Sequence, residues 1–308
     1  MKSYYKGIIL AICGASLWGI SDAVVQFVFS HVTINALYLV GLRLLGAGTL
    51  MTTFSLIKNR SWLKELFHNK KSIFTFIVFA IFGMGGSQLM CFLAIKASNA
   101  PTATVIQSTA PIFIIIYLSL RNWNWPKKFE LIAILIAFTG AYILVTGGKF
   151  DVLALTPMGL FLGVCAAIGE AIDDISPGDL FEKYGTINIV GLAMLVAGIF
   201  FIPCYFIMPV PALKPIDIGA IIYIIIGGTM LGYTIYLASV LYISPSVTGM
   251  LEVFEPLVAT LIAVVFLHTN FGFMSMLGSA LVILATMVQT IASSKDSKDA
   301  KELEIVEQ

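Results

Sequence analysis

Charged residues are scarce in this sequence. Asp, Glu, Lys and Arg together make up 11% of the 308 positions, whereas water-soluble domains carry about 25%. Apolar residues fill 59% of the positions and the mean hydropathy is +0.97, compared with roughly 45–50% apolar residues in a soluble domain. Such a chain has too few polar side chains to cover a soluble surface. The composition therefore excludes a soluble enzyme and indicates an integral membrane protein.

Cysteine is also rare, and its positions form no recognisable site. Cys13, Cys91, Cys165 and Cys204 all lie inside apolar runs, without CxxC spacing. This arrangement excludes a zinc site or a disulfide framework, and we expect all four to be small buried packing residues. No Walker A sequence is present, which excludes an ATP-binding domain within this chain. We expect no metal, no cofactor and no nucleic-acid partner.

Long apolar runs, bounded by charged, Pro or Asn residues, dominate the sequence. A helix of roughly 20 apolar residues spans the hydrocarbon core, and only a helix satisfies its own backbone polar groups in lipid. A barrel would need alternating strands, which this sequence lacks. We therefore predict an all-α integral membrane protein with ten transmembrane helices, at 7–29, 35–57, 72–95, 101–120, 128–147, 158–181, 188–208, 217–242, 246–267 and 271–291.

Basic residues are concentrated in alternate loops. The N-terminus, the loops at 58–71 and 121–128, Lys183 and the C-terminal tail hold most of them. Cytoplasmic loops carry the excess of Lys and Arg, so we predict a multi-pass protein of the cell membrane with both termini in the cytoplasm. The tail at 292–308 is polar and mixed in charge, and we expect it to be a disordered cytoplasmic segment.

The sequence contains two internal matches without gaps. Residues 7–22 (GIILAICGASLWGISD) align with 159–174 (GLFLGVCAAIGEAIDD), and residues 83–146 align with 228–291. We therefore predict two five-helix repeats, at 1–150 and 151–291. An odd number of helices per repeat inserts the second copy with the opposite orientation. Inverted repeats of this kind recur in transporters, with the substrate site between them near the bilayer midplane.

Several motifs resemble the drug/metabolite transporter superfamily, in its EamA-like branch, over nearly the whole chain to about residue 291. They are LWGISDAVV, RLLGAG and AIKASNAPTATVIQSTAPIF in the first half, and ASVLYISPSVTGMLEVFEPLVATLIAVVFL and GSALVILATM in the second. The resemblance implies a ten-helix carrier that moves small organic solutes by alternating access. Two features depart from the family. SLRNWNW and FLHTNFG replace its usual Gly-Glu pairs, and Glu170, Asp173 and Asp174 stand where members commonly carry neutral or aromatic residues in the sixth helix.

Six of the 17 acidic residues fall within predicted helices away from the loops, whereas Arg43 is the one basic residue placed in this way. A charge at mid-bilayer costs from about 2.5 kcal/mol upward unless it faces protein or water, so these residues predict a wet, electronegative cavity. Burial and like-charge crowding both favour the neutral form of a carboxyl group, which gives a physical basis for proton-coupled exchange with a cation. The proton-coupling candidates are Asp22, Glu170, Asp173, Asp174 and Glu255, and the substrate-binding candidates are Trp18, Asp22, Gln88, Gln107, Glu170, Asp174, Tyr233 and Glu252.

Structural alternatives stand beside several of these roles. The sixth helix could end near Ile175 and leave Asp173 and Asp174 among the cytoplasmic headgroups. Arg43 either pairs with an acid or contacts an anionic group of the substrate. The remaining alternatives are interhelical hydrogen bonds for the amides and tyrosine, packing for Trp18 and a structural role for Glu252 and Glu255.

Taken together, these patterns favour a secondary carrier for a small organic molecule that is cationic or zwitterionic. An intramembrane acid-dependent enzyme is the first alternative, but the GxGD motif of aspartyl proteases is absent. A channel or a structural membrane partner is the second alternative, and the inverted repeat argues against it. The expected partners are the lipid bilayer and the substrate, and the sequence leaves open whether two copies form a homodimer.

Overall fold

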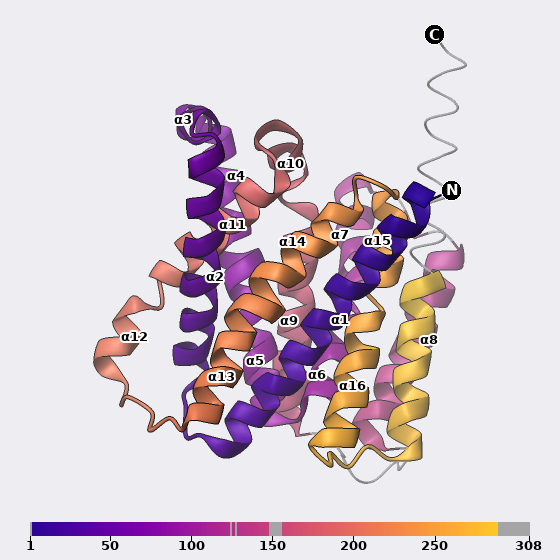
Figure 1. Ribbon diagram of the computed structural model, residues 1–308. Coiled ribbons are helices and arrows are strands. Elements are labelled where there is room, and N and C mark those ends of the chain that lie inside the picture. The colour runs from indigo at the N-terminus through magenta and orange to yellow at the C-terminus, as the bar shows by residue number, and fades with distance from the viewer. Residues whose placement is uncertain (1, 124, 127, 148–155, 289–308) are drawn as a thin grey trace, which may run out of the picture.

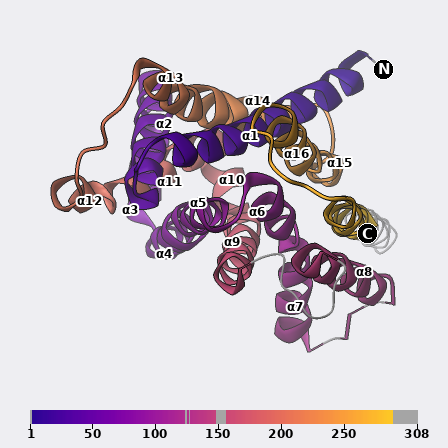
Figure 2. The ribbon, with the colours of Figure 1, turned by 90° about the horizontal axis from the view of Figure 1, so that it is seen from below.

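The computed structural model describes residues 2–123, 125–126, 128–147 and 156–288, and all regular structure in them is helical. Most helices run roughly side by side (Figure 1), and α7 and α8 lie far from α2 and α12 when the molecule is seen from below (Figure 2). The elements are α1 (Lys2–His31), α2 (Ala36–Lys58), α3 (Ser61–His68), α4 (Lys70–Val78), η1 (Phe79–Gly86), α5 (Ser87–Ala97), α6 (Ala100–Gln107), α7 (Ala110–Asn122), α8 (Lys128–Thr146), α9 (Pro157–Ile175), α10 (Gly178–Tyr184), α11 (Thr186–Ile199), α12 (Ile202–Ile207), α13 (Pro215–Tyr223), η2 (Ile224–Leu231), α14 (Gly232–Ser239), α15 (Pro245–Leu251) and α16 (Phe254–Phe266).

Seven of the described helical segments are long and apolar enough to cross a membrane, so the chain is a multi-pass membrane protein. The other three predicted runs fall on α8, α9 and the apolar helix Phe273–Val288, which are not among the seven. The number of ten crossings therefore stays a prediction. The seven segments are Tyr4–His31, Ala36–Lys58, Lys70–Ala97, Ala100–Asn122, Thr186–Ile207, Pro215–Ser239 and Val247–Phe266.

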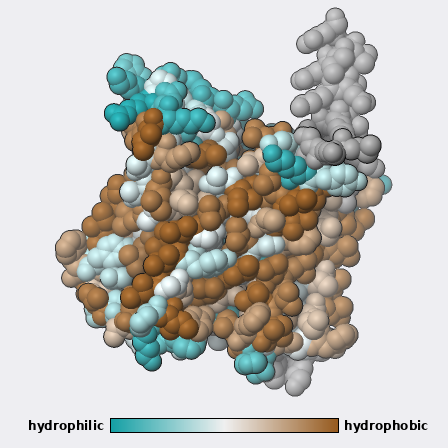
Figure 3. Space-filling model, viewed as in Figure 1, coloured by the Kyte–Doolittle hydropathy of each residue, from teal (hydrophilic) through white to brown (hydrophobic). Residues whose placement is uncertain are grey.

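The outer surface of the helices is apolar. Figure 3 shows hydrophobic residues over most of the visible face, with hydrophilic residues gathered at the end that holds α3. Large apolar side chains such as Phe74, Leu120 and Phe206 are exposed, which suits contact with lipid tails. Cys13 is also exposed, Cys165 and Cys204 are partly buried, and Cys91 is buried. The prediction that all four cysteines are buried is therefore wrong for Cys13 and fully confirmed for Cys91 alone.

Several helices begin where a polar side chain caps the first turn. The side-chain oxygens of Asn35, Asn69 and Asn99 accept hydrogen bonds from the first backbone N–H groups of α2, α4 and α6. Thr156 and Ser244 do the same for α9 and α15. These caps satisfy donors that have no partner within the helix.

The long helices are interrupted at corresponding places in the two halves. The second internal match can be extended by four residues toward the N-terminus, which aligns Phe79 with Ile224. The π-helical segments η1 and η2 therefore occupy equivalent positions of the two halves. The same match sets the start of α6 on the start of α15. Both of these helices stop shortly before a proline, Pro111 or Pro256, because proline lacks the N–H that a continuous helix needs.

The sixth predicted helix differs from the expected 158–181. The structure ends α9 at Ile175 and starts the separate helix α10 at Gly178. Pro177 lies between them in a turn, and it has no backbone N–H group to continue the hydrogen-bond ladder of the helix. The alternative of a helix that ends near Ile175 is therefore the correct one.

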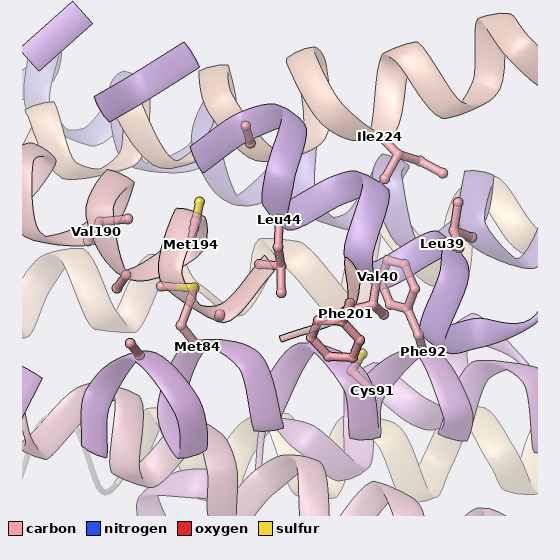
Figure 4. Close-up of a cluster of buried hydrophobic side chains, with 14 of the residues drawn as sticks. Leu39, Val40, Leu44, Met84, Cys91, Phe92, Val190, Met194, Phe201 and Ile224 are labelled. Atoms are coloured by element: carbon pink, nitrogen blue, oxygen red, sulfur yellow. The ribbon is translucent and has the colours of Figure 1, made fainter. Parts of the chain in front are cut away.

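The core is built largely on the packing of α2 against α11 and the neighbouring helices, where Leu44, Met84, Met194 and Ile224 are fully or almost fully buried (Figure 4). Glycines bring α2 and α11 close together. A Cβ added at Gly48 would collide with the backbone of Leu195, and one added at Gly198 would lie 2.7 Å from the backbone nitrogen of Leu45. These two contacts are equivalent, because positions 48 and 198, and positions 45 and 195, are each 150 residues apart. The contact of Gly41 with Phe201 corresponds in the same way to the contact of Gly191 with Met51.

Candidate functional site

A cavity of about 840 Å³ opens between helices from both halves of the chain. Its wall is formed by residues of α6, α7, α9, α10, α11, α14, α15, α16 and the helix Phe273–Val288. Among the described lining residues none is Lys, Arg or His, whereas five are acidic: Glu170, Asp174, Glu182, Glu252 and Glu255. The cavity therefore offers negative charge without a fixed positive partner in its described wall.

Glu170 is held in place by two donors from the first half. The Ser87 hydroxyl and the Gln107 amide nitrogen both donate to its Oε2 atom, at 2.6 Å and 2.9 Å. This geometry depends on Gly169, because a Cβ there would lie 2.8 Å from the Cα of Ser87. The bond also fixes the orientation of the amide, since only its NH₂ group donates to a carboxylate. Gln107 Oε1 is consequently left buried without a hydrogen-bond partner.

Glu252 has a different neighbour in the second half. The Tyr236 hydroxyl donates a short hydrogen bond to its Oε1 atom. Trp18 packs against this tyrosine and against Tyr233, with ring centroids 4.7 Å and 4.6 Å apart. The Tyr233 hydroxyl accepts a hydrogen bond of 3.2 Å from Gln88. Gln88 and Tyr233 occupy aligned positions of the internal match, so this bond joins equivalent residues of the two halves.

Arg43 and Asp22 lie deep in the structure, with only 3% and 4% of their surfaces exposed. The Arg43 Nε atom donates to the Thr229 hydroxyl at 2.6 Å, and its guanidinium carbon lies 5.1 Å from the centre of the Phe92 ring. Asp22 interacts electrostatically with Arg43 and with Glu255. Within the described part of the chain, Arg43 forms no ion pair with a carboxylate at 4.0 Å or less.

Asp173 and Asp174 point to different surroundings. Asp174 is exposed and lines the cavity. Asp173 is half-buried against Gly83, and its Oδ1 atom is buried without a hydrogen-bond partner. The two neighbouring acids are therefore separated, with one facing the cavity and the other facing η1.

The structure brings together only part of the predicted substrate site. Gln107, Glu170, Asp174 and Glu252 line the cavity, and so does the proton-coupling candidate Glu255. The other candidates, Trp18, Asp22, Gln88, Tyr233 and Asp173, are not part of the cavity wall. Trp18, Gln88 and Tyr233 form the layer of contacts behind Tyr236. Their predicted roles stay predictions.

Sequence reasoning missed two residues that hold the acids. One feature of the sequence pointed to Ser87, which stands between the glycines of η1 and the candidate Gln88. One feature also pointed to Tyr236, which follows Tyr233 by three residues and so shares its helix face. Neither signal indicates which acid each residue contacts. The described residues contain no group of three or more His, Cys, Asp or Glu side chains arranged to hold a metal ion.

At the end of the molecule opposite α10, one side chain links the two halves. Gln26 of α1 donates from Nε2 to the Thr269 hydroxyl at 2.7 Å, and its Oε1 accepts from the backbone N–H of Ala100 at 2.7 Å. Lys96 donates to the carbonyl of Ile34 at the same end, at 2.8 Å. These bonds tie the ends of the helices together where the cavity has no described lining residues.

Comparison with known proteins places this geometry in a family. The profile of the EamA-like transporter family matches residues 5–146 and again residues 157–291. The uncharacterized inner membrane transporter YicL of Salmonella typhimurium is 29% identical over 301 residues, which covers 97% of this chain and all of the relative. The threonine/homoserine exporter RhtA of Escherichia coli is 24% identical over 225 residues, or 72% of each chain.

A solved crystal structure shares the fold with a TM-score of 0.62 and 15% identity, over 96% of this chain and 98% of the other. The family profile covers nearly all of the described helices, once in each half. The protein therefore belongs to the EamA-like transporter family, whose members that resemble it are membrane transporters.

Proposed function

We propose that this protein is a secondary carrier, not an enzyme, that moves a small organic cation or zwitterion across the cell membrane by alternating access. The observation that carries the proposal is the acid-lined cavity between the two halves, in which no described lining residue is basic. A cation that enters such a cavity replaces its lost hydration with carboxylate contacts. The name of RhtA, an exporter of threonine and homoserine, supports a zwitterion as the second choice.

The proposed architecture has two inverted five-helix halves, at 1–150 and 151–291, which give ten crossings. Three observations support it: the family profile matches twice, the helix interruptions fall at aligned positions, and the contacts between α2 and α11 recur after 150 positions. The hydrogen bond between Gln88 and Tyr233 lies where a two-fold axis would pass. Carriers of this type rock one half against the other around a central site.

The cavity in this structure opens at the end that holds α10. Gly178 and Glu182 of α10 are among its lining residues, and Lys183 follows Glu182 in the sequence. Because basic loops stay in the cytoplasm, we assign this end, together with both termini, to the cytoplasmic side. The conformation is then inward-facing, and the bonds of Gln26 close the outer side.

Proton coupling is the further part of the proposal. Asp22 interacts with Glu255, which reaches the cavity wall. Glu170 and Asp174 line the same cavity, so substrate and proton compete for one electronegative region. Exchange follows because a bound cation disfavours protonation of the nearby acids, and protonation disfavours the cation.

Counterflow in proteoliposomes tests this function. A proton gradient should drive the uptake of labelled organic cations or amino acids by the wild-type protein, and Glu170→Gln and Asp22→Asn should reduce that uptake. Glu65→Gln is the matched control, since Glu65 is an exposed acid of α3 outside the central cavity. If all three variants transport as the wild type does, the acid-lined route is wrong. Hydrolysis of a membrane substrate would favour an enzyme instead.

A further inference from the structure

The acceptor atoms of the cavity wall are only partly engaged in hydrogen bonds. Three side chains each have one polar atom engaged and one free acceptor. Glu170 accepts both of its hydrogen bonds at Oε2, Glu252 accepts its bond at Oε1, and Gln107 has used its NH₂ group on Glu170. The free acceptors are therefore Oε1 of Glu170, Oε2 of Glu252 and Oε1 of Gln107, and the last is buried without a partner.

The hydroxyl donors of the same wall, in contrast, nearly all have hydrogen-bond acceptors. A hydroxyl group has a single proton to donate, and each of four hydroxyls donates it to a backbone carbonyl. The fifth, that of Tyr236, donates to Glu252. Thr186, which lies at the start of α11, is the exception among the described hydroxyls of the wall. The four engaged on carbonyls are those of Thr104, Ser108, Thr248 and Thr286.

This imbalance has a direct consequence for ligand chemistry. A primary ammonium group carries three N–H donors and one positive charge, which match the three free acceptors and the acidic wall. A quaternary ammonium has the charge but no donor, so the buried Gln107 carbonyl would stay unpaired. A carboxylate needs donors or a fixed cation, and the described wall offers neither a basic side chain nor more than one unengaged hydroxyl.

The rest of the wall is apolar and fits the body of such a molecule. Pro111, Ile114, Phe181 and Met250 all line the cavity, and its volume of about 840 Å³ lies in the range of sites for small organic ligands. We propose that the cargo is an organic amine with a primary ammonium group and without a carboxylate. This proposal rests on the carrier function and narrows the choice between a cation and a zwitterion.

Six labelled compounds test the proposal in counterflow with the reconstituted full chain. Two carbon skeletons are used, phenylethyl and butyl. Each is tested as the primary amine, as the N,N,N-trimethyl derivative of that amine, and as the amino acid that carries an added α-carboxylate, which is phenylalanine or norvaline. We expect kcat/KM for at least one primary amine to exceed that of both its derivatives by about tenfold or more, because a hydrogen bond to a charged donor contributes roughly this factor.

Variants separate recognition from folding. Gln107→Leu should reduce the ratio of amine to trimethyl transport about tenfold or more, whereas the trimethyl compound itself should still be carried. Tyr236→Phe retains the ring and frees a further acceptor on Glu252, so the preference for the amine should persist. Glu65→Gln should leave the ratio unchanged.

Each outcome has a distinct meaning. A preference for a trimethyl compound or an amino acid, or a Gln107→Leu ratio equal to that of the wild type, overturns the amine proposal and leaves the carrier function standing. The absence of flux for all six compounds contradicts the carrier function for organic cations and zwitterions as well.

Discussion

Gln26 offers a direct test of the proposed closure of the outer side. Its amide makes two hydrogen bonds of 2.7 Å, to the Thr269 hydroxyl and from the Ala100 backbone N–H. Each such bond contributes about 0.5–1.5 kcal/mol net, so Gln26→Leu should destabilise the closed outer side by about 1–3 kcal/mol. That corresponds to a shift of roughly 5- to 150-fold in the equilibrium between outward- and inward-open states. Thr269→Val breaks one of the two bonds and should produce about half of this free-energy change.

A buried reporter cysteine makes this shift measurable. Thr102 lies at the start of α6 beside Ala100 and is only 6% exposed. In a background without the four native cysteines, Thr102→Cys should react slowly with an impermeant maleimide added from outside. The rate should rise by roughly 5- to 150-fold with Gln26→Leu and less with Thr269→Val. Equal labelling rates in all three proteins, at equal thermal stability, would refute the role of Gln26 in closing the outer side.

Three further predictions concern stability and orientation. Gly48→Ala should destabilise the protein by about 1–3 kcal/mol through overpacking, seen as a lower thermal midpoint in detergent. Gly219→Ala, where a Cβ meets open space, should not lower the midpoint, and a drop of equal size would contradict this account of the α2–α11 contact. Thr229→Val removes the acceptor of the buried Arg43 and should cost about 1–3 kcal/mol, whereas a serine should restore most of that loss. Asp179→Cys, without native cysteines, should react with impermeant maleimide only from the cytoplasmic side, and labelling from outside would reverse the proposed orientation.

Much of the architecture could be predicted from composition and spacing. Long apolar runs leave a helix as the one element that suits lipid, so the helical class and the multi-pass topology followed from hydropathy alone. The internal match aligns Pro111 with Pro256, and the observed helix breaks before both prolines agree with that alignment. The family resemblance is confirmed over both halves.

The partners of individual acids were beyond the reach of the sequence. Helical spacing places Glu170, Asp173 and Asp174 on one stripe, yet Asp173 faces Gly83 while Asp174 reaches the cavity. The rotation of α9 against its neighbours decides this, and that rotation depends on close contacts such as Gly169 against Ser87. Periodicity gives the face of a helix but not the element opposite it.

Arg43 illustrates the same limit. A lone cation among six acids suggested an ion pair or a substrate contact, whereas its observed hydrogen bond goes to the Thr229 hydroxyl in η2. The Thr229 hydroxyl itself donates to the backbone carbonyl of Ile224, five residues earlier, so the side chain that receives Arg43 is held within η2. Because π-helical segments are rare, the apolar pattern of this run predicted a continuous α-helix and gave no reason to place Thr229 opposite Arg43.

The glycine contacts between α2 and α11 have a consequence for how such a fold assembles. Gly48 against Leu195 and Gly198 against Leu45 are one contact viewed from both sides, and an isologous surface of that kind pairs a molecule with its own copy. Two separate chains of half this length, inserted into the bilayer in opposite directions, would meet through the same small residues. Fusion into a single polypeptide would then free each side to diverge, and the unlike residues at the aligned positions Gln107 and Glu252 are an example of such a difference.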